Sequence, residues 1–211
     1  VDLGASGGTV VRGAVTADAL AVEGIHRFDN RPVERSGRYV WPIERLRSAI
    51  VAGIRRADAS GEIDTIGIDT WGLDFGVLAD GDLLRAPVSY RDPALASTAE
   101  EVFERAGRRE IFDATGIANW GTPNTLFQYH HLATREPDVL ERADRLLMMP
   151  QLLTRLLGGR PAGEVTVAST TQLLDVRERA WSTGLLDRLD LPVDPLPEPE
   201  PVGTQIGRAH V

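Results

Sequence analysis

The chain opens with Val1-Asp2-Leu3-Gly4-Ala5-Ser6-Gly7-Gly8-Thr9-Val10-Val11, which sets an acid and a turn of small residues between apolar stretches. Gly4, Gly7 and Gly8 have no Cβ, so the backbone can come close to a ligand and turn its N–H groups toward anionic oxygens. Asp2, at the predicted strand end, is placed to hold a hydrated Mg²⁺ through one carboxylate. The pattern predicts a phosphate loop, and a β-hairpin with a glycine turn after a surface aspartate is the alternative.

Length and composition place the chain among globular proteins. Its 211 residues are enough for one large domain or two small ones. The formal net charge of -8 argues against general nucleic-acid binding, which needs clustered Lys and Arg. Cys is absent from the sequence, and no apolar run approaches the roughly 20 residues that span a bilayer. We therefore expect a cytoplasmic protein with no nucleic acid and no membrane among its partners. The composition is compatible with an enzyme that acts on small molecules but does not indicate one.

The first half of the chain alternates strand and helix patterns. Apolar residues recur at helical spacing at Leu46, Ile50 and Ile54. A strand pattern follows this helix, and a strand–helix–strand order implies a parallel crossover. An Asp-Gly pair at 80–81 predicts a hairpin. The predicted elements are antiparallel strands at 10–15 and 21–28, a helix from residue 43 to 54, a buried strand at 63–69, and a hairpin of 75–78 with 83–84.

The second half is predicted to be mostly helical. The predicted helices lie at 97–106, 125–132, 151–157 and 181–189, and a Thr- and Ser-rich stretch at 166–174 is either a loop or an irregular strand. Pro is dense between residues 192 and 201, which stiffens the chain into an extended linker. We predict one domain over residues 1–190 and a Pro-rich linker over residues 191–211 toward a missing C-terminal domain. Both ends look cut, which indicates a piece of a longer protein.

A second candidate site follows the predicted strand at 63–69, where the sequence continues Thr70-Trp71-Gly72-Leu73-Asp74. In α/β sheets, ligands gather outside the carboxyl ends of parallel strands. Gly72 allows backbone approach, Asp74 could accept sugar hydroxyls, and Trp71 offers an aromatic wall for the apolar face of a sugar. The alternative is that Trp71 is a core residue and Asp74 a solvated turn residue.

Two further segments offer polar groups to the same crevice. Arg91 can fork to hydroxyls or phosphate, and Asp92 can fix its guanidinium. A surface pair at a strand end is the alternative for these two residues. Asn119, Thr122 and Asn124 lie in a polar loop that could line the cleft, but such residues are common in any loop.

Motifs along nearly the whole chain resemble those of one known family. They lie at 1–8, 23–30, 66–75, 90–92, 121–126, 146–150 and 164–173. The glycine turn is shared with many actin-like ATPases. Asp-Thr-Trp-Gly at 69–72 and Ser-Thr-Thr-Gln at 169–172 are more particular. On these motifs the sequence is similar to the FGGY carbohydrate kinases, and among them to those that act on L-rhamnulose.

The resemblance implies a fold and a reaction. The fold is α/β, a ribonuclease-H-like (actin-like ATPase) domain with a mixed five-stranded sheet flanked by helices. It is the N-terminal of two domains that clasp sugar and ATP. The reaction is transfer of the γ-phosphate of ATP to the 1-hydroxyl of L-rhamnulose, which gives L-rhamnulose 1-phosphate. The family's catalytic base is an aspartate soon after the linker, and its adenine pocket also lies in the C-terminal domain, so neither is expected in this chain.

The resemblance also implies roles for single residues. The ATP phosphate turn is formed by Ala5, Ser6, Gly7, Gly8 and Thr9, with Asp2 near the Mg²⁺. The sugar touches Gly72, with Trp71, Asp74 and Arg91 as neighbours. The family commonly has a basic residue where this chain has Thr9, so backbone contacts rather than a side-chain contact to phosphate are expected there.

Two other functions stay open on the sequence. One is an actin-like ATPase module without a sugar substrate, although a hydroxyl-reading group of Trp71, Asp74 and Arg91 speaks against it. The other is a non-catalytic sugar-binding or regulatory domain. Phosphoryl transfer needs charge neutralisation from both sides of the nucleotide and closure that expels water. We therefore expect the chain alone to have no appreciable kinase turnover.

Overall fold

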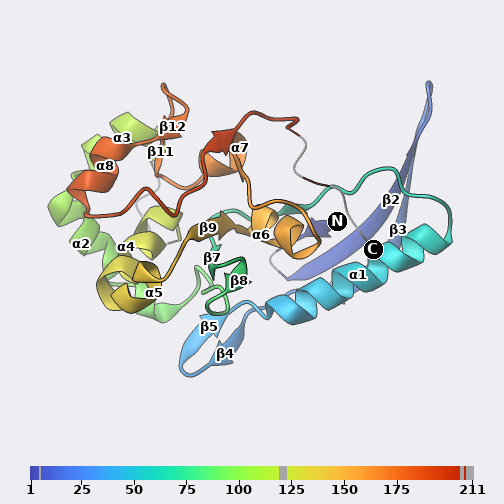
Figure 1. Ribbon diagram of the computed structural model, residues 1–211, viewed down its shortest axis with the longest axis horizontal. Helices are drawn as coiled ribbons and strands as arrows, with labels where there is room; N and C mark the ends of the chain where they lie inside the picture. The colour runs from blue at the N-terminus through green and yellow to red at the C-terminus, as the bar shows by residue number, and fades with distance from the viewer. Residues whose placement is uncertain (5, 119–122, 205–206, 208–211) are drawn as a thin grey trace.

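The structure, a computed structural model, describes residues 1–4, 6–118, 123–204 and 207. One end of the molecule holds the long hairpin of β2 (Gly7–Val15) and β3 (Leu20–Asp29), with α1 (Ile43–Ala59) lying along it. The other end is a group of shorter helices (Figure 1). A small sheet lies between these two ends. The mixed α/β class predicted from the sequence is confirmed.

The larger sheet has four strands in the order β3-β2-β1-β6, where β1 is Asp2–Leu3 and β6 is Asp69–Thr70. β1 pairs with β2 and β2 with β3 in antiparallel fashion, as predicted. β6 pairs with β1 in parallel, so the predicted crossover through a helix is confirmed. Because parallel neighbours end at the same edge, this pairing decides where the two candidate sites lie.

The long helix α1 buries one apolar face against the hairpin. Leu46, Ile50 and Ile54 are all buried, at the positions where the helical spacing placed them. Gly53 lies on the same face, and a Cβ there would collide with the Val10 side chain of β2. The helix therefore approaches the sheet closely at Gly53.

The smaller sheet has three strands in the order β8-β7-β9, where β7 is Phe75–Ala79, β8 is Asp82–Leu83 and β9 is Arg145–Met148. The turn between β7 and β8 has positive φ at both Asp80 (52°) and Gly81 (87°), as a tight hairpin turn requires. The predicted hairpin is confirmed. The prediction of one five-stranded sheet is wrong in its number of strands, because the described strands form separate sheets of four and three strands and three two-stranded pairs.

The predicted strand at 63–69 is also shorter than expected. Only Asp69–Thr70 pairs as β6, and the ladder ends where the Val1 amino group donates to the Gly67 carbonyl at 2.8 Å. Residues 63–68 belong to no strand of the described structure.

The remaining elements complete the helical end. The helices are η1 (Pro93–Leu95), α2 (Thr98–Arg105), α3 (Arg108–Thr115), α4 (Thr125–Arg135), α5 (Pro137–Glu141), α6 (Met149–Leu156), α7 (Val165–Ala168) and α8 (Thr183–Arg188). The short strands are β4 (Val33–Arg35), β5 (Arg38–Val40), β10 (Gly163–Glu164), β11 (Leu174–Asp175), β12 (Ala180–Trp181) and β13 (Pro199–Glu200). None of the described helices is long and apolar enough to pass through a bilayer.

Most of the predicted helices are confirmed within a few residues, with two differences. The stretch at 166–174, predicted as a loop or irregular strand, begins inside α7, because the Glu164 carboxylate accepts hydrogen bonds from the first amides of that helix. The last predicted helix begins at Thr183 rather than at 181, because Trp181 is paired in β12.

The first ten residues of the predicted linker lie against the domain. Leu191 is buried in the helical core, and β13 pairs in parallel with β10. The carbonyls of Pro192, Pro195 and Pro197 accept hydrogen bonds of 2.6, 2.7 and 2.9 Å, from the Tyr129 hydroxyl, the Leu146 amide and the Trp181 indole in that order. Pro has no amide hydrogen, so carbonyls provide these bonds. The division at residue 190 stays a prediction.

Candidate functional site

The two stretches singled out in the sequence leave the larger sheet at the same edge. In the parallel pair, Asp2 is the register partner of Asp69 and Leu3 that of Thr70. The glycine turn follows β1 and the Trp71-Gly72 turn follows β6, so both begin outside the carboxyl ends of neighbouring strands. This is the location at which α/β sheets bind ligands.

The glycine turn is held by its own backbone and by one buried asparagine. The Gly4 amide donates to the Gly7 carbonyl at 2.9 Å, and the Asn30 side chain donates to the Gly4 carbonyl at 2.6 Å. Asn30 is fully buried and also donates its backbone N–H to the Ser6 carbonyl at 3.3 Å. Asn30 was not identified from the sequence, because its role depends on pairing between β2 and the end of β3.

The predicted phosphate-turn residues differ in their surroundings. Ser6 is exposed and Gly7 half-buried, whereas Gly8 is buried and a Cβ there would collide with the Phe28 ring. Gly8 is therefore required by packing inside β2, in addition to any approach of a ligand. Ala5 lies outside the described residues.

Asp2 lies on the same sheet face as two other polar side chains. It is exposed and opposite Thr9 in the antiparallel pair and Asp69 in the parallel pair, and directly opposite residues point to one side of a sheet. Exposed carboxylates beside each other are suitable for a hydrated divalent cation. Within the described part of the chain, no group of three or more carboxylate or imidazole side chains comes together as a metal cage.

The turn after β6 is built around Asp74, whose side chain is fully buried. One carboxylate oxygen, Oδ2, accepts from the indole N–H groups of Trp41 at 2.6 Å and Trp71 at 3.0 Å. The other, Oδ1, accepts from the Tyr90 backbone N–H and the Gln128 side-chain amide, each at 2.8 Å. Burial raises the pKa of Asp74 to about 6, against the opposite effect of these four donors.

This geometry corrects one expectation about the sugar site. Asp74 was expected to accept sugar hydroxyls, but its four donors all belong to the protein and occupy both oxygens. A hydroxyl cannot reach the carboxylate without displacing one of them. Asp74 instead fixes Trp71, whose ring centroid lies 4.1 Å from that of the buried Trp41.

Gly72 and Leu73 form the tip of this turn. Leu73 has φ of 75°, a conformation that a branched side chain rarely adopts, and its carbonyl accepts from the Thr125 hydroxyl at 2.7 Å and from Gln128 at 3.2 Å. At Gly72, a Cβ would come within 2.8 Å of the Thr170 hydroxyl. Thr170 is exposed and comes from the Ser-Thr-Thr-Gln motif, so the structure joins the two most particular motifs of the sequence.

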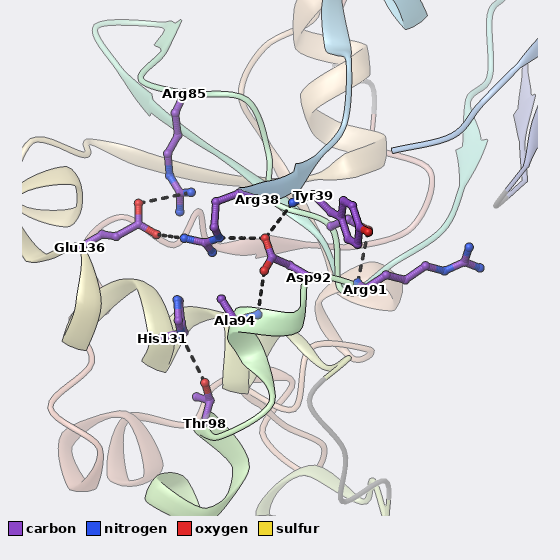
Figure 2. A network of polar contacts seen from close by, with 10 residues as sticks. Arg38, Tyr39, Arg85, Arg91, Asp92, Ala94, Thr98, His131 and Glu136 are labelled. Atoms are coloured by element: carbon purple, nitrogen blue, oxygen red, sulfur yellow. Dashed lines mark hydrogen bonds and ion pairs between the residues drawn. The ribbon is translucent and has the colours of Figure 1, made fainter. Parts of the chain in front are cut away.

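Arg91 is exposed beside this turn, but the prediction that Asp92 fixes its guanidinium is wrong. Its Nε donates to the Tyr90 hydroxyl at 3.1 Å, and the guanidinium lies 5.3 Å from the Tyr90 ring centroid. Figure 2 shows the Asp92 carboxylate bonded instead to Arg38 Nε and to the backbone amides of Tyr39 and Ala94. Asp92 therefore fixes the chain that carries Arg91, through the backbone rather than through the guanidinium.

The polar loop predicted at 119–124 is only partly described. Asn119 and Thr122 lie outside the described residues. Asn124 is buried at the start of α4. Asn124 is thus the residue that directly precedes the first turn of α4.

The comparisons with known proteins agree with this arrangement. Residues 13–210 match the model of the FGGY family of carbohydrate kinases, N-terminal domain. The chain is 37% identical over 191 residues to rhamnulokinase of Oceanobacillus iheyensis and 39% identical over 193 residues to rhamnulokinase of Bacteroides thetaiotaomicron. Each alignment covers 90% of this chain and 40% of the relative, so the chain spans about two fifths of the length of these relatives.

Solved structures show the same fold at low identity. The xylulose kinase of Lactobacillus acidophilus matches with a TM-score of 0.84 at 17% identity, over 99% of this chain and 42% of that one. The glycerol kinase of Plasmodium falciparum with ADP matches with a TM-score of 0.74 at 16% identity, over 100% of this chain and 44% of that one. The predicted ribonuclease-H-like, actin-like architecture is confirmed.

Proposed function

The chain belongs to the FGGY family of carbohydrate kinases, and from this premise we propose that it is the N-terminal domain of a cytoplasmic, ATP-dependent L-rhamnulose kinase. The reaction is transfer of the γ-phosphate to the 1-hydroxyl of the ketose. The observation that carries the proposal is the parallel pairing of β1 with β6, which starts the glycine turn and the Trp71-Gly72 turn at one edge. The choice of L-rhamnulose is supported by the named relatives at 37% and 39% identity.

On the phosphate side, the proposed contacts come mainly from the backbone. The turn from Ala5 through Ser6, Gly7 and Gly8 to Thr9 faces the phosphates of ATP, because amide groups there can point at anionic oxygens. Asp2, with Asp69 beside it, holds a hydrated Mg²⁺. The ion, when bound, neutralises charge on the β- and γ-phosphate oxygens.

On the sugar side, the proposed contacts are Gly72, Trp71, Thr170 and Arg91. Gly72 leaves space beside the Thr170 hydroxyl, which donates its proton to the Val167 carbonyl at 2.8 Å and can accept a hydrogen bond from a sugar hydroxyl. Trp71 is half-buried and held by Asp74, so its ring is a fixed wall for an apolar sugar face. Arg91 is exposed and has guanidinium donors beyond the Nε that Tyr90 occupies.

The proposal includes a second domain joined through the segment from residue 191 to 211. The resemblance to the family implies that the catalytic base and the adenine pocket lie there, and the alignments cover only 40% of each relative. Without the second side of the cleft, water is not expelled and the phosphate charge is only partly neutralised. The chain alone is therefore expected to bind ketose without turning over ATP.

Calorimetric titration of the chain with L-rhamnulose, D-xylulose and Mg-ATP, each alone, tests the proposal. We expect L-rhamnulose to bind and to bind more tightly than D-xylulose, with no release of ADP when sugar and Mg-ATP are mixed. Trp71→Ala should weaken the sugar binding while leaving that of Mg-ATP unchanged. Sugar-dependent release of ADP by the chain would contradict the need for a second domain. Hydrolysis of ATP without any sugar binding would favour an ATPase module.

A further inference from the structure

The carboxylate of Asp74 joins four separate segments of the fold. Its donors are Trp41, just before α1; Trp71, in the turn itself; Tyr90, next to Arg91; and Gln128, on α4. Two of these segments carry residues of the proposed sugar site. No direct contact of Asp74 with a ligand is needed for the carboxylate to affect that site.

All four partners of Asp74 are N–H donors, and this restricts its protonation state. An ionised carboxylate only accepts hydrogen bonds, whereas a protonated one carries an O–H donor. Each oxygen already accepts two N–H groups, so a proton on either one faces a donor instead of an acceptor. Protonation therefore removes at least one of the four bonds, whichever oxygen takes the proton.

We propose that Asp74 is a positioning residue of the sugar site, whose ionised carboxylate holds the Trp71 ring and, through the Tyr90 amide, the segment that carries Arg91. Loss of the charge loosens both and lowers the affinity for the ketose. This inference rests on the proposed function, because it assigns a control to the same site. It makes sugar binding dependent on pH through a residue that the sugar does not touch.

The groups around Asp74 allow its titration to be distinguished from that of others. The elements that bring its partners, together with α6, carry these titratable and charged side chains: Arg38, Tyr39, Glu44, Arg45, Arg47, Arg55, Arg56, Asp58, Asp69, Tyr90, Arg91, Asp92, Tyr129, His130, His131, Arg135 and Arg155. Arg38 is paired with Asp92, and His131 Nδ1 lies 3.3 Å from the Thr98 hydroxyl. Burial raises the pKa of Asp74 to about 6, whereas it lowers the pKa of His131 and of His130.

The first test needs no sugar. In ¹H–¹⁵N spectra of the protein, assigned with Trp41→Phe and Trp71→Phe, we expect the two indole N–H resonances to shift together with a midpoint near pH 6. Asp74→Asn should abolish that shared transition, because the amide carries no ionisable proton. Resonances that stay constant, or that still titrate in Asp74→Asn, would overturn the inference.

The second test measures the affinity for L-rhamnulose against pH. If only the ionised form binds well, the dissociation constant rises about tenfold one pH unit below the midpoint. His131→Gln should keep this dependence, and Asp74→Asn should bind weakly at every pH. If Asp74→Asn fails to fold, Gln128→Met serves instead, because removing one donor should move the midpoint to higher pH.

The outcomes separate the two proposals. Indoles that titrate together in a protein that binds no ketose at any pH contradict the proposed function. A ketose that binds with equal affinity above and below the midpoint contradicts the positioning role alone. A midpoint that Gln128→Met leaves unchanged also contradicts the role, because the carboxylate would then not sense its donors.

Discussion

The two halves of the candidate site are built in opposite ways. On the phosphate side, Asp2 and Ser6 are exposed, and the turn is set by strand register and by carbonyls that accept from Asn30. On the sugar side, Asp74 is fully buried and fixes four segments with its two oxygens. The phosphate side depends on backbone conformation, and the sugar side depends on particular side chains.

This difference follows from what each side has to recognise. Amide N–H groups of almost any residue can bind a phosphate, so the side chains of a phosphate turn are free to vary. A sugar ring requires an aromatic face and hydroxyl partners at fixed positions, so the residues behind them must be rigid. Substitutions on the two sides should therefore differ in both stability and binding.

The largest difference should come from Asp74→Ala compared with Asp2→Ala. Removing the buried carboxylate leaves four N–H donors without an acceptor, at about 1–3 kcal/mol for each donor that finds no water. We expect Asp74→Ala to lower the free energy of unfolding by about 4 kcal/mol. Asp2→Ala, at an exposed position, should change it by less than about 0.5 kcal/mol. Urea denaturation of both variants measures the two changes in the free energy of unfolding. Equal losses in the two variants would contradict the expected difference between the two sides.

The next effect is a dependence of stability on pH that only the sugar side has. Burial raises the pKa of Asp74 in the folded protein to about 6, whereas the ordinary pKa of an aspartate is 3.8. Between these values the unfolded chain binds fewer protons, so the free energy of unfolding falls as pH rises. Over the whole window the fall amounts to about 3 kcal/mol.

This pH effect is measured as the stability of the wild type minus that of Asp74→Asn at each pH. The difference should fall from about pH 4 to about pH 6 and then level off. A difference that rises across this window would show that the four hydrogen-bond donors lower the pKa of Asp74 by more than burial raises it. The ionised form that the sugar site needs is thus the less stable one, as is common where a site stores strain.

A substitution at Gly72 should act on binding more than on folding. The Cβ of Gly72→Ala meets the Thr170 hydroxyl at 2.8 Å, so either the turn or Thr170 must shift. We expect sugar affinity to fall about tenfold, or about 1.4 kcal/mol. Thr170→Ala in the same chain removes the clashing oxygen and should restore part of the loss, because the two sites are in contact. If the double variant loses as much sugar affinity as the two single variants together, the contact between Gly72 and Thr170 is contradicted.

The sequence predicted the local features of the fold well. The hairpin at Asp80-Gly81 and the buried face of α1 depend on residues close together in the chain, and both are confirmed. The parallel crossover was also predicted, because strand–helix–strand order has one usual outcome. The division of the strands into separate sheets was missed, because it depends on where residues from distant parts of the chain pair.

The site was predicted less completely than the fold, for a related reason. Trp71 and Gly72 were identified because their types are unusual next to a strand end. Asn30 and Thr170 both lie in motifs that the sequence analysis singled out, but neither was identified as a site residue. Their partners, Gly4 and Gly72, are distant in the chain, and the motifs do not show which residues they meet. Asp74 was identified but given the wrong partners, since the sequence does not show that Trp41 and Gln128 surround it.

The smallest effect should be that of a charge added on the phosphate side. Thr9→Lys places an ammonium opposite Asp2 on the exposed face, where a surface pair contributes about 0–1 kcal/mol. Stability should therefore change little, because the backbone of β2 keeps its register. Affinity for magnesium tripolyphosphate should rise about two- to fivefold, since the added cation lies beside the turn that faces the phosphates.

Ala14→Lys is the matched control, because it adds the same charge at an exposed position of β2, farther along the strand from the turn. If both variants bind magnesium tripolyphosphate equally more tightly, the gain comes from net charge and the phosphate does not lie at this turn. If Thr9→Lys alone gains and loses the gain at high salt, the anion lies within reach of residue 9. A large loss of stability in Thr9→Lys would show that this side also depends on its side chains, which would remove the distinction between the two halves of the site.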